Sequence, residues 1–396
     1  MAEQRRITVV NQHTNNYGDD AAGVALVERC LSELQATQVD VFYIWDGGDG
    51  GLPVDDERVR HHRLPVLAGS RDARPALARA TLRQLLLRKG VHPGLRGLAS
   101  SARDSDFVLV SPAGANIGIY KDWTYLFVLV GLVLNGIRPI FFQNTIGRSN
   151  SRIFDAVARY VLRRSDLYVR ESASQRWLAS EGLTAYLGVD TGLLLDIEPQ
   201  GVTDPVIAVV PTNLSGWHRD FKSDDDGLLW RDALARGLAI SAAEHGLGVR
   251  IVPHLYGSQA EPAEIERFIA ALAKHGCPAE IAPVSTLSGY ISELGRASVV
   301  VSMRYHGLIL SARQGVPCVS LAYENKMSEA AAYLGQSELA MHVRDVSSEL
   351  IVKHIAHAIK HRTRIRASSR TRISSLIDIA RGPLLAMRSE LLRRAS

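Results

Sequence analysis

The stretch that decides the fold is residues 298–329, SVVVSMRYHGLILSARQGVPCVSLAYENKMSE. It reads as an apolar strand, a charged loop, an apolar helix closed by glycine, a second strand and a second charged loop. In a parallel β-α-β unit both loops fall at the carboxyl ends of neighbouring strands, which is where open α/β sheets bind ligands. We therefore expect Arg304, His306 and Lys326 to meet in one crevice.

The residue types in these two loops indicate the kind of ligand. Two permanent cations and a titratable imidazole suit a small, multiply anionic substrate that undergoes proton transfer. Gly307 directly follows His306 and lets the helix begin close to a ligand. The helix N-terminus adds partial positive charge, which favours a phosphate group.

Apolar runs of strand length alternate with helical patterns along the whole chain, which predicts parallel sheets covered on both faces. A segment rich in proline and glycine at 196–205 looks like a linker, and the pattern restarts after it. The fold class that we predict is α/β, with two doubly wound Rossmann-like domains facing a central cleft. We expect an N-terminal domain at 1–197 on the acceptor side, a C-terminal domain at 205–335 on the donor side, and a basic helical tail at 336–396 that packs back on the N-terminal domain.

Composition is that of a folded protein with room for two cores, at 396 residues, 46% hydrophobic and 22% charged. The formal net charge of +5 is unevenly distributed, because the chain from Lys353 onward holds eleven Lys or Arg against Asp378 and Glu390. Such a tail can dock on an anionic membrane surface or form a solvated helical face. Nucleic acid is excluded as a partner, because neither stacking aromatics nor a known binding module accompanies the charge.

Cysteine usage and hydropathy bear on the compartment. Cys30, Cys277 and Cys318 are odd in number and far apart, which fits neither a disulfide framework nor a zinc site. We read them as buried thiols in a reducing compartment. The N-terminus lacks the apolar segment of a signal peptide, and the most apolar stretch, residues 126–134, is too short to span a bilayer. We expect a cytoplasmic protein that the basic tail can hold at the inner face of the plasma membrane, without a metal or other cofactor.

Three motifs carry a resemblance to a known family. The most specific is Ser302-Met-Arg-Tyr-His-Gly307, followed at fixed spacing by Gly315-Val-Pro317 and Tyr323-Glu-Asn-Lys326. The others are Asn16-Tyr-Gly-Asp19 and Val169-Arg-Glu-Ser172. On these motifs the chain resembles the polysaccharide pyruvyl transferases over residues 7–335, and that family is similar in fold to the two-domain B-type (GT-B) glycosyltransferases.

The resemblance implies an activity and a division of roles. Members of the family use phosphoenolpyruvate as donor and attach pyruvate as a ketal to two hydroxyls of one sugar. The phosphoenolpyruvate site would then comprise Arg170, Arg304, His306, Gly307 and Lys326. His306 would be the acid that protonates the methylene carbon, and Asp19 or Asp20 would accept a hydroxyl proton. The remaining acceptor-side candidates are Asn16, Gly18, Trp217 and His254, of which the last two follow predicted strands.

Each principal candidate also has a purely structural explanation. His306 could be a hydrogen-bonded loop histidine, Arg170 could pair with Glu171, and Asp19 could cap a helix. Two other functions also stay open. The same two-domain cleft serves glycosyltransferases that use a nucleotide-sugar donor, and a cationic pocket could bind an anionic glycan without turnover.

Overall fold

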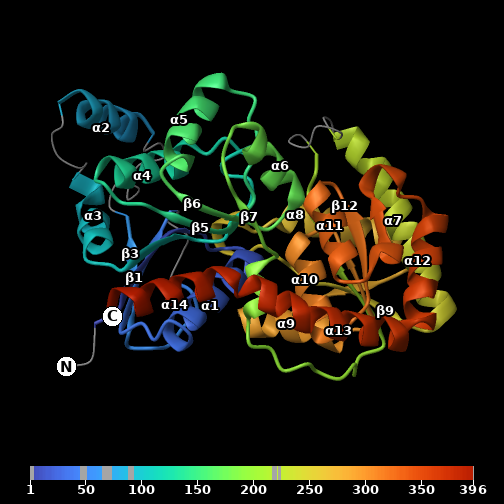
Figure 1. The fold of residues 1–396 in the computed structure, drawn as a ribbon. Coiled ribbons are helices and arrows are strands. Elements are labelled where there is room, and N and C mark those ends of the chain that lie inside the picture. The colour runs from blue at the N-terminus through green and yellow to red at the C-terminus, as the bar shows by residue number, and fades with distance from the viewer. Residues whose placement is uncertain are drawn as a thin grey trace. The chain divides into compact units, whose positions relative to one another are not determined.

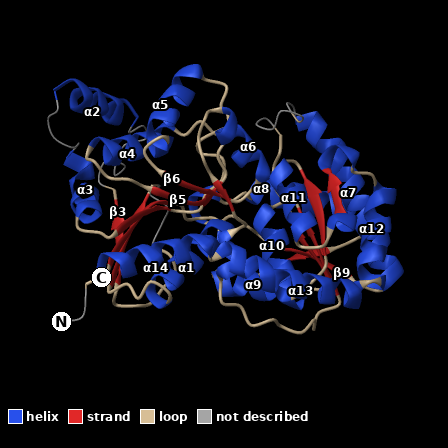
Figure 2. Ribbon diagram, in the orientation of Figure 1, coloured by secondary structure: helices blue, strands red, loops and turns tan. Residues whose placement is uncertain are grey.

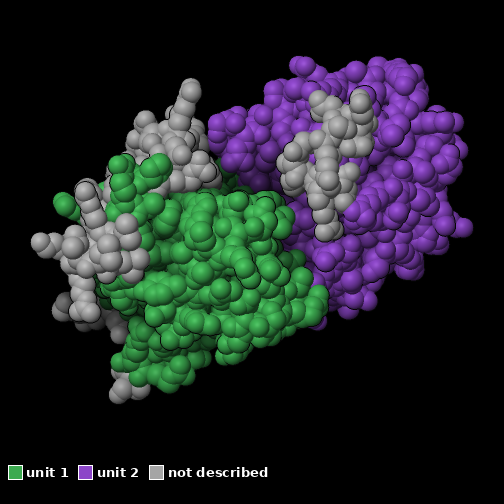
Figure 3. All heavy atoms as spheres, turned by 90° about the horizontal axis from the view of Figure 1, so that it is seen from above, with its two compact units in different colours: residues 1–14, 19–195, 377–396 green, residues 15–18, 196–376 purple. Residues whose placement is uncertain are grey.

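The computed structural model describes residues 4–44, 51–64, 74–87, 93–215, 221 and 224–395. The chain divides into two compact units, which Figure 3 shows in different colours. Unit 1 comprises residues 1–14, 19–195 and 377–396, and unit 2 comprises residues 15–18 and 196–376. Each unit has its own parallel sheet with helices on both faces (Figure 2).

Unit 1 contains a seven-stranded sheet in the order β3-β2-β1-β4-β5-β6-β7 (Figure 1). Its strands are β1 (Arg6–Gln12), β2 (Gln38–Tyr43), β3 (Val59–Arg63), β4 (Phe107–Val110), β5 (Ile140–Asn144), β6 (Asp166–Val169) and β7 (Tyr186–Leu187). Its helices are α1 (Tyr17–Ser32), α2 (Arg74–Leu87), α3 (Arg96–Arg103), α4 (Trp123–Leu134), α5 (Arg152–Leu162), α6 (Ser172–Ser180) and α14 (Gly382–Ala395). The first two residues of α1 are grouped with unit 2.

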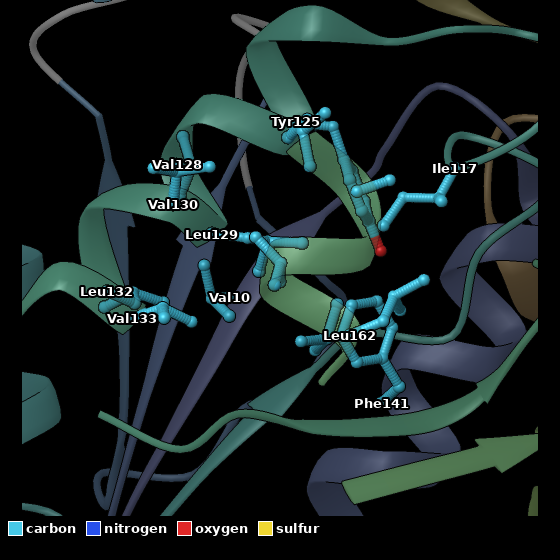
Figure 4. Packing of buried hydrophobic residues seen from close by; sticks show 14 of the residues in the cluster. Val10, Ile117, Tyr125, Val128, Leu129, Val130, Leu132, Val133, Phe141 and Leu162 are labelled. Atoms are coloured by element: carbon cyan, nitrogen blue, oxygen red, sulfur yellow. The ribbon is translucent and has the colours of Figure 1, made fainter. Parts of the chain in front are cut away.

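The core of unit 1 forms around α4, the most apolar helix of the chain. The side chains of α4 are apolar on every face of the helix, and such a helix is stable only when it is buried. Figure 4 shows Leu129, Leu132 and Val133 of α4 near Val10 of the sheet, the ring of Phe141 beside Leu162, and Tyr125 next to Ile117. The carboxylate of Asp122 fixes the start of α4 by accepting a hydrogen bond from the Tyr125 backbone N–H at 3.0 Å.

Unit 2 contains a six-stranded sheet in the order β10-β9-β8-β11-β12-β13. Its strands are β8 (Val206–Val210), β9 (Gly248–Ile251), β10 (Ala279–Ile281), β11 (Val299–Ser302), β12 (Cys318–Ala322) and β13 (Ala340–His342). Its helices are α7 (Asp224–His245), α8 (Pro262–Lys274), α9 (Leu287–Arg296), α10 (Tyr305–Gln314), α11 (Asn325–Tyr333), α12 (Ser348–Lys360) and most of α13 (Arg362–Ala380).

The strand order creates a switch point in each unit. In unit 2 the chain runs outward from β8 to β9 and β10, then returns to place β11 on the other side of β8. The loops after β8 and β11 therefore leave in opposite directions, which opens a crevice at the carboxyl edge of the sheet. Unit 1 has the same arrangement between β1 and β4. Arg304 and His306 follow β11 directly and so lie at the switch point of unit 2.

The structure adds three strands and shifts the predicted boundaries. β3, β7 and β13 were not predicted, because each is short and lies at or next to the edge of a sheet, where apolar patterning is weakest. β13 and α12 are part of unit 2, so the segment that rejoins unit 1 begins at Ile377 and not at residue 336. Residues 15–18 belong to unit 2 although they precede most of unit 1.

The three cysteines are buried and unbridged, as predicted. Among the helices of the described residues, none combines the length and apolarity needed to cross a membrane.

Candidate functional site

The loop between β11 and α10 is fixed by one serine and one glycine. Ser302 Oγ donates to the carbonyl of Arg304 at 2.8 Å and accepts from the Arg304 N–H at 3.1 Å. A Cβ at Gly307 would lie 2.2 Å from Ser302 Oγ, so only glycine lets α10 start this close to the strand. Arg304 keeps an extended backbone as the residue before the helix, and His306 falls in its first turn.

The imidazole of His306 is buried against the N-terminal motif. His306 is 6% exposed, and a Cβ at Gly18 would lie 2.0 Å from its Nδ1. Gly18 therefore packs directly on the ring, and a larger residue there would displace it. The structure brings together two residues that the sequence assigned to opposite sides of the reaction.

Residues 15–18 reach this position because they pair with the loop after β9. Asn16 forms a β-bridge with Leu255, and its side-chain Oδ1 accepts the Gly18 N–H at 2.9 Å. The Tyr17 N–H donates to the carbonyl of His254 at 3.2 Å. The Tyr17 ring also stacks on Tyr290, with centroids 5.1 Å apart. The motif thus forms part of the carboxyl edge of unit 2.

A second histidine accompanies His306. His254 is 4% exposed, its Nδ1 lies 2.8 Å from the Tyr290 hydroxyl, and its ring is nearly parallel to that of His306 with centroids 6.5 Å apart. Burial lowers the pKa of His254 well below its ordinary value, and the charges of Arg304 and His306 act in the same direction. His254 is therefore neutral near pH 7, and Tyr290 orients its ring.

Each of the two cations of the site forms an ion pair with a glutamate. Arg304 Nη2 lies 2.6 Å from Glu261, and Lys326 Nζ lies 2.9 Å from Glu324. The charges of all four groups act on the buried hydroxyl of Tyr323. Burial raises the pKa of Tyr323, and both cations oppose that rise.

Arg304, His306 and Lys326 lie at the starts of helices, where the macrodipole favours anions. Arg304 and His306 stand at the start of α10, and Lys326 stands in the first turn of α11. Cations are unfavourable near a helix N-terminus, because the macrodipole is positive there. A bound multiply charged anion would offset this positive charge. The geometry suits the capture of such an anion beside a titratable imidazole.

A small pocket opens beside His254. It has an empty volume of about 250 Å³, including its mouth, and its lining comprises Pro211, Pro253, His254, Leu255, Glu261, Glu264 and Ile265. Glu264 is held by Arg231 through two hydrogen bonds of 3.0 Å, and this pair is almost fully buried. No group of three or more potential metal-ligating side chains occurs among the residues that the structure describes.

Arg170 lies in unit 1, whereas the other predicted phosphoenolpyruvate ligands lie in unit 2. Its side chain is 3% exposed, and its Nη1 lies 2.8 Å from Asp190, which is fully buried. Its Nε donates to Thr145 Oγ1 at 3.1 Å. The partner of Arg170 is therefore Asp190, and the expected structural alternative, a pair with Glu171, does not form: Glu171 accepts from Ser174.

Asp19, the last residue of the N-terminal motif, and its neighbour Asp20 lie in different environments. Asp20 is 2% exposed, whereas Asp19 is partly exposed and contributes charge near His13.

His13 was not predicted as a site residue. Its Nε2 lies 3.2 Å from the Asn116 amide, and burial lowers its pKa. Neither a motif nor a periodicity marks this residue in the sequence. Trp217 lies outside the described residues.

Comparison with known proteins identifies the family. A family model described as polysaccharide pyruvyl transferase matches residues 16–325. A search of curated proteins found no match. Among solved structures, a UDP-GlcNAc 2-epimerase from Neisseria meningitidis bound to UDP-GlcNAc has a TM-score of 0.60 and 13% identity, covering 98% of this chain and 100% of that chain. An α,α-trehalose 6-phosphate synthase from Burkholderia multivorans has a TM-score of 0.58 and 14% identity, with both chains covered completely.

Identities this low show the fold alone, which is the GT-B fold of two Rossmann-like units. The family match is more specific, because it spans most of the chain and contains both the 16–19 motif and the loop of Arg304 and His306. The chain belongs to the polysaccharide pyruvyl transferase family.

Proposed function

We propose that this protein transfers a pyruvyl group from phosphoenolpyruvate to two hydroxyls of one hexose in a cell-surface polysaccharide, a glycolipid or a lipid-linked precursor. The observation that carries the proposal is the position of His306, buried at the start of α10 between Arg304 and Gly307. The neighbouring Tyr305 ring lies 5.2 Å from the His306 ring and 5.9 Å from Lys326 Nζ. Phosphoenolpyruvate carries a carboxylate and a phosphate, and fixed cations in a partly dry pocket suit both.

In the proposed reaction, protonated His306 gives its proton to the methylene carbon of phosphoenolpyruvate. The electron pair of the double bond forms the new C–H bond, and the adjacent carbon becomes electrophilic. The first sugar hydroxyl attacks that carbon and loses its proton to a carboxylate, for which Asp19 is the candidate. The second hydroxyl attacks as the bond to phosphate breaks, and its proton restores His306. The proton on the carboxylate leaves with inorganic phosphate.

Arg304 and Lys326 act as the anion clamps in this scheme. When the donor binds, its charged groups replace Glu261 and Glu324 as partners of the two cations. Gly307 leaves room for the donor at the helix start, and Arg170 is a further candidate for binding the donor. The acceptor-side candidates are Asn16, Gly18, Asp20, Trp217 and His254, of which Gly18 also packs on His306. Phosphoenolpyruvate is the co-substrate, and no other cofactor is required.

The test uses purified full-length protein with phosphoenolpyruvate and a panel of galactosides, glucosides and mannosides. We expect release of inorganic phosphate together with a mass increase of the sugar that corresponds to a pyruvate ketal. His306→Ala should lower the rate by at least about 100-fold, because a general acid contributes about 10²–10⁴. His275→Ala is the matched control, since His275 belongs to the same unit but pairs with Asp232 on the surface.

Undiminished turnover by His306→Ala would show that His306 is not the general acid. Ligand-induced thermal stabilisation separates the alternatives. Stabilisation by a uridine diphosphate and not by phosphoenolpyruvate would indicate a nucleotide-sugar transferase. Tight binding of a pyruvylated glycan without consumption of phosphoenolpyruvate would indicate a binding module.

A further inference from the structure

Two loops of unit 1 place apolar side chains in solvent next to cations. In the loop after β4, Ile119 is 60% exposed and Tyr120 is 45% exposed, and in the first turn of α5, Ile153 is 72% exposed. The cations are Lys121, Arg148 and Arg152, of which the two arginines are exposed. We call these six residues the apolar-basic patch.

The backbone holds the two loops side by side. Ile117 forms a β-bridge with Ile146, and the Gly147 N–H donates to the carbonyl of Ile117 at 2.8 Å. Lys121 Nζ donates to Asn150 Oδ1 at 3.3 Å. The patch is therefore a built surface that presents its apolar residues outward, and it is not a frayed end.

The positive charge of the patch is not neutralised by the nearby acids Asp122 and Asp155, because their carboxylates form other hydrogen bonds. Asp122 caps α4, and Asp155 is buried and accepts the Ser149 N–H at 3.0 Å. Neither Arg148 nor Arg152 forms an ion pair within the part of the chain that the structure describes. Surfaces that lie in the headgroup region of an anionic bilayer combine exposed apolar side chains with cations that form no ion pair. The exposed isoleucines and tyrosine beside Arg148 and Arg152 have this composition.

We propose that the apolar-basic patch docks unit 1 on an anionic lipid surface. Both loops leave the carboxyl edge of the sheet, the edge at which α/β units bind ligands. Docking there would bring that edge to the membrane. This inference does not depend on pyruvyl transfer, because it concerns binding alone. It also differs from the expectation that the basic tail provides the membrane contact.

The experiment is co-flotation of the full chain with unilamellar vesicles of phosphatidylcholine and phosphatidylglycerol at 60:40, compared with pure phosphatidylcholine. We expect binding to the anionic vesicles that falls with added salt. Reversing both charges in Arg148→Glu/Arg152→Glu should weaken binding by at least about 25-fold, since each cation contributes about fivefold. Ile119→Ser/Ile153→Ser should weaken it by about tenfold or more.

The matched control is Arg163→Glu/Arg164→Glu, which makes the same charge change at the other end of α5, about 16 Å away along the helix. It should stay within about threefold of the wild type. Circular dichroism checks that each variant is folded. Failure of the wild type to bind anionic vesicles would overturn the proposal, as would equal losses in the control and patch variants. Self-association that Ile119→Ser/Ile153→Ser abolishes, without vesicle binding, would instead assign the patch to a second copy of the chain.

Discussion

Position 18 is the most sensitive single residue around His306. A methyl group added there would lie 2.0 Å from the imidazole, so the ring or the motif must move. We expect Gly18→Ala to lower phosphoenolpyruvate-dependent phosphate release by at least about tenfold, because misplacement of an acid by about 1 Å is costly. The free energy of unfolding should also fall, by about 1–3 kcal/mol through overpacking, so the rate is measured at a temperature where the variant is folded. Gly201→Ala is the control, since nothing lies within 4 Å of the Cβ it would add. Full activity of Gly18→Ala would contradict the packing described here.

His254 should make the protein acid-sensitive. Its pKa in the folded chain lies well below the ordinary value of 6.5, chiefly because the ring is buried. Below about pH 6.5 the unfolded chain therefore binds a proton that the folded chain does not. The resulting stability is complete above that pH and is lost as the pH falls toward the folded-state pKa.

The measurement is urea unfolding between pH 7.5 and 5.5 for the wild type and His254→Gln. The wild type should lose up to about 1.4 kcal/mol per pH unit more than the variant. The glutamine side chain can keep a hydrogen bond to Tyr290 but does not titrate. Parallel stability curves for the two proteins would show that the pKa of His254 is the same in the folded and the unfolded chain.

Individual residues differ in how far the sequence could predict them. The placement of Arg304 and His306 after β11, and of Lys326 after the neighbouring strand β12, was predictable, because the strand ends of one β-α-β unit lie at the same edge of the sheet. The approach of Gly18 to His306 was not, since it depends on a bridge between Asn16 and Leu255 that pairs distant segments. Glu261 and Tyr290 were missed for the same reason: each comes from a helix or loop whose partner only the tertiary structure reveals.

At the scale of the elements, the packing of α12 on α7 can be tested, because it assigns α12 to unit 2. Its Ile351 packs on Gly237 of α7, and a Cβ at Gly237 would lie 2.6 Å from that of Ile351. We expect Gly237→Ala to destabilise unit 2 by about 1–3 kcal/mol through overpacking, despite the better helix propensity of alanine. Gly97→Ala in α3 meets nothing within 4 Å and should be neutral or slightly stabilising. Calorimetry measures both, and a stabilised Gly237→Ala would show that α12 packs loosely.

The predictability of the elements followed their burial. Fully buried strands such as β8 and β11 are recognisable from the sequence, because short runs of Val, Ile and Ala without charged residues suit a covered parallel sheet. The edge strand β3 carries the sequence VRHHR and lacks that pattern. The last helices are so rich in Lys and Arg that their buried apolar residues are hard to recognise in the sequence. A basic tail was therefore predicted from residue 336 onward, although α12 is part of unit 2.

At the scale of the whole molecule, the chain passes repeatedly between its units. Unit 1 is assembled from three separate segments, and its last segment is the C-terminal one. That segment is tied to the rest of unit 1 by a hydrogen bond of 2.8 Å from Gln143 Nε2 to the carbonyl of Ala380, and by Arg381 with Glu33 at 3.0 Å. Unit 1 is therefore complete only when the final residues have been added.

The stability of unit 1 should accordingly depend on the apolar face of α14. Leu384 is 1% exposed and Leu385 is 48% exposed, so adjacent leucines provide a matched pair. We expect Leu384→Ala to reduce the free energy of unfolding of unit 1 by about 2–5 kcal/mol, through lost burial and the cavity left behind. Leu385→Ala should change it by less than about 1 kcal/mol. Hydrogen exchange should show faster exchange in β5 of the Leu384→Ala protein, with β11 of unit 2 unchanged. Equal effects of the two substitutions, or a loss of protection confined to unit 2, would show that α14 is not part of the core of unit 1.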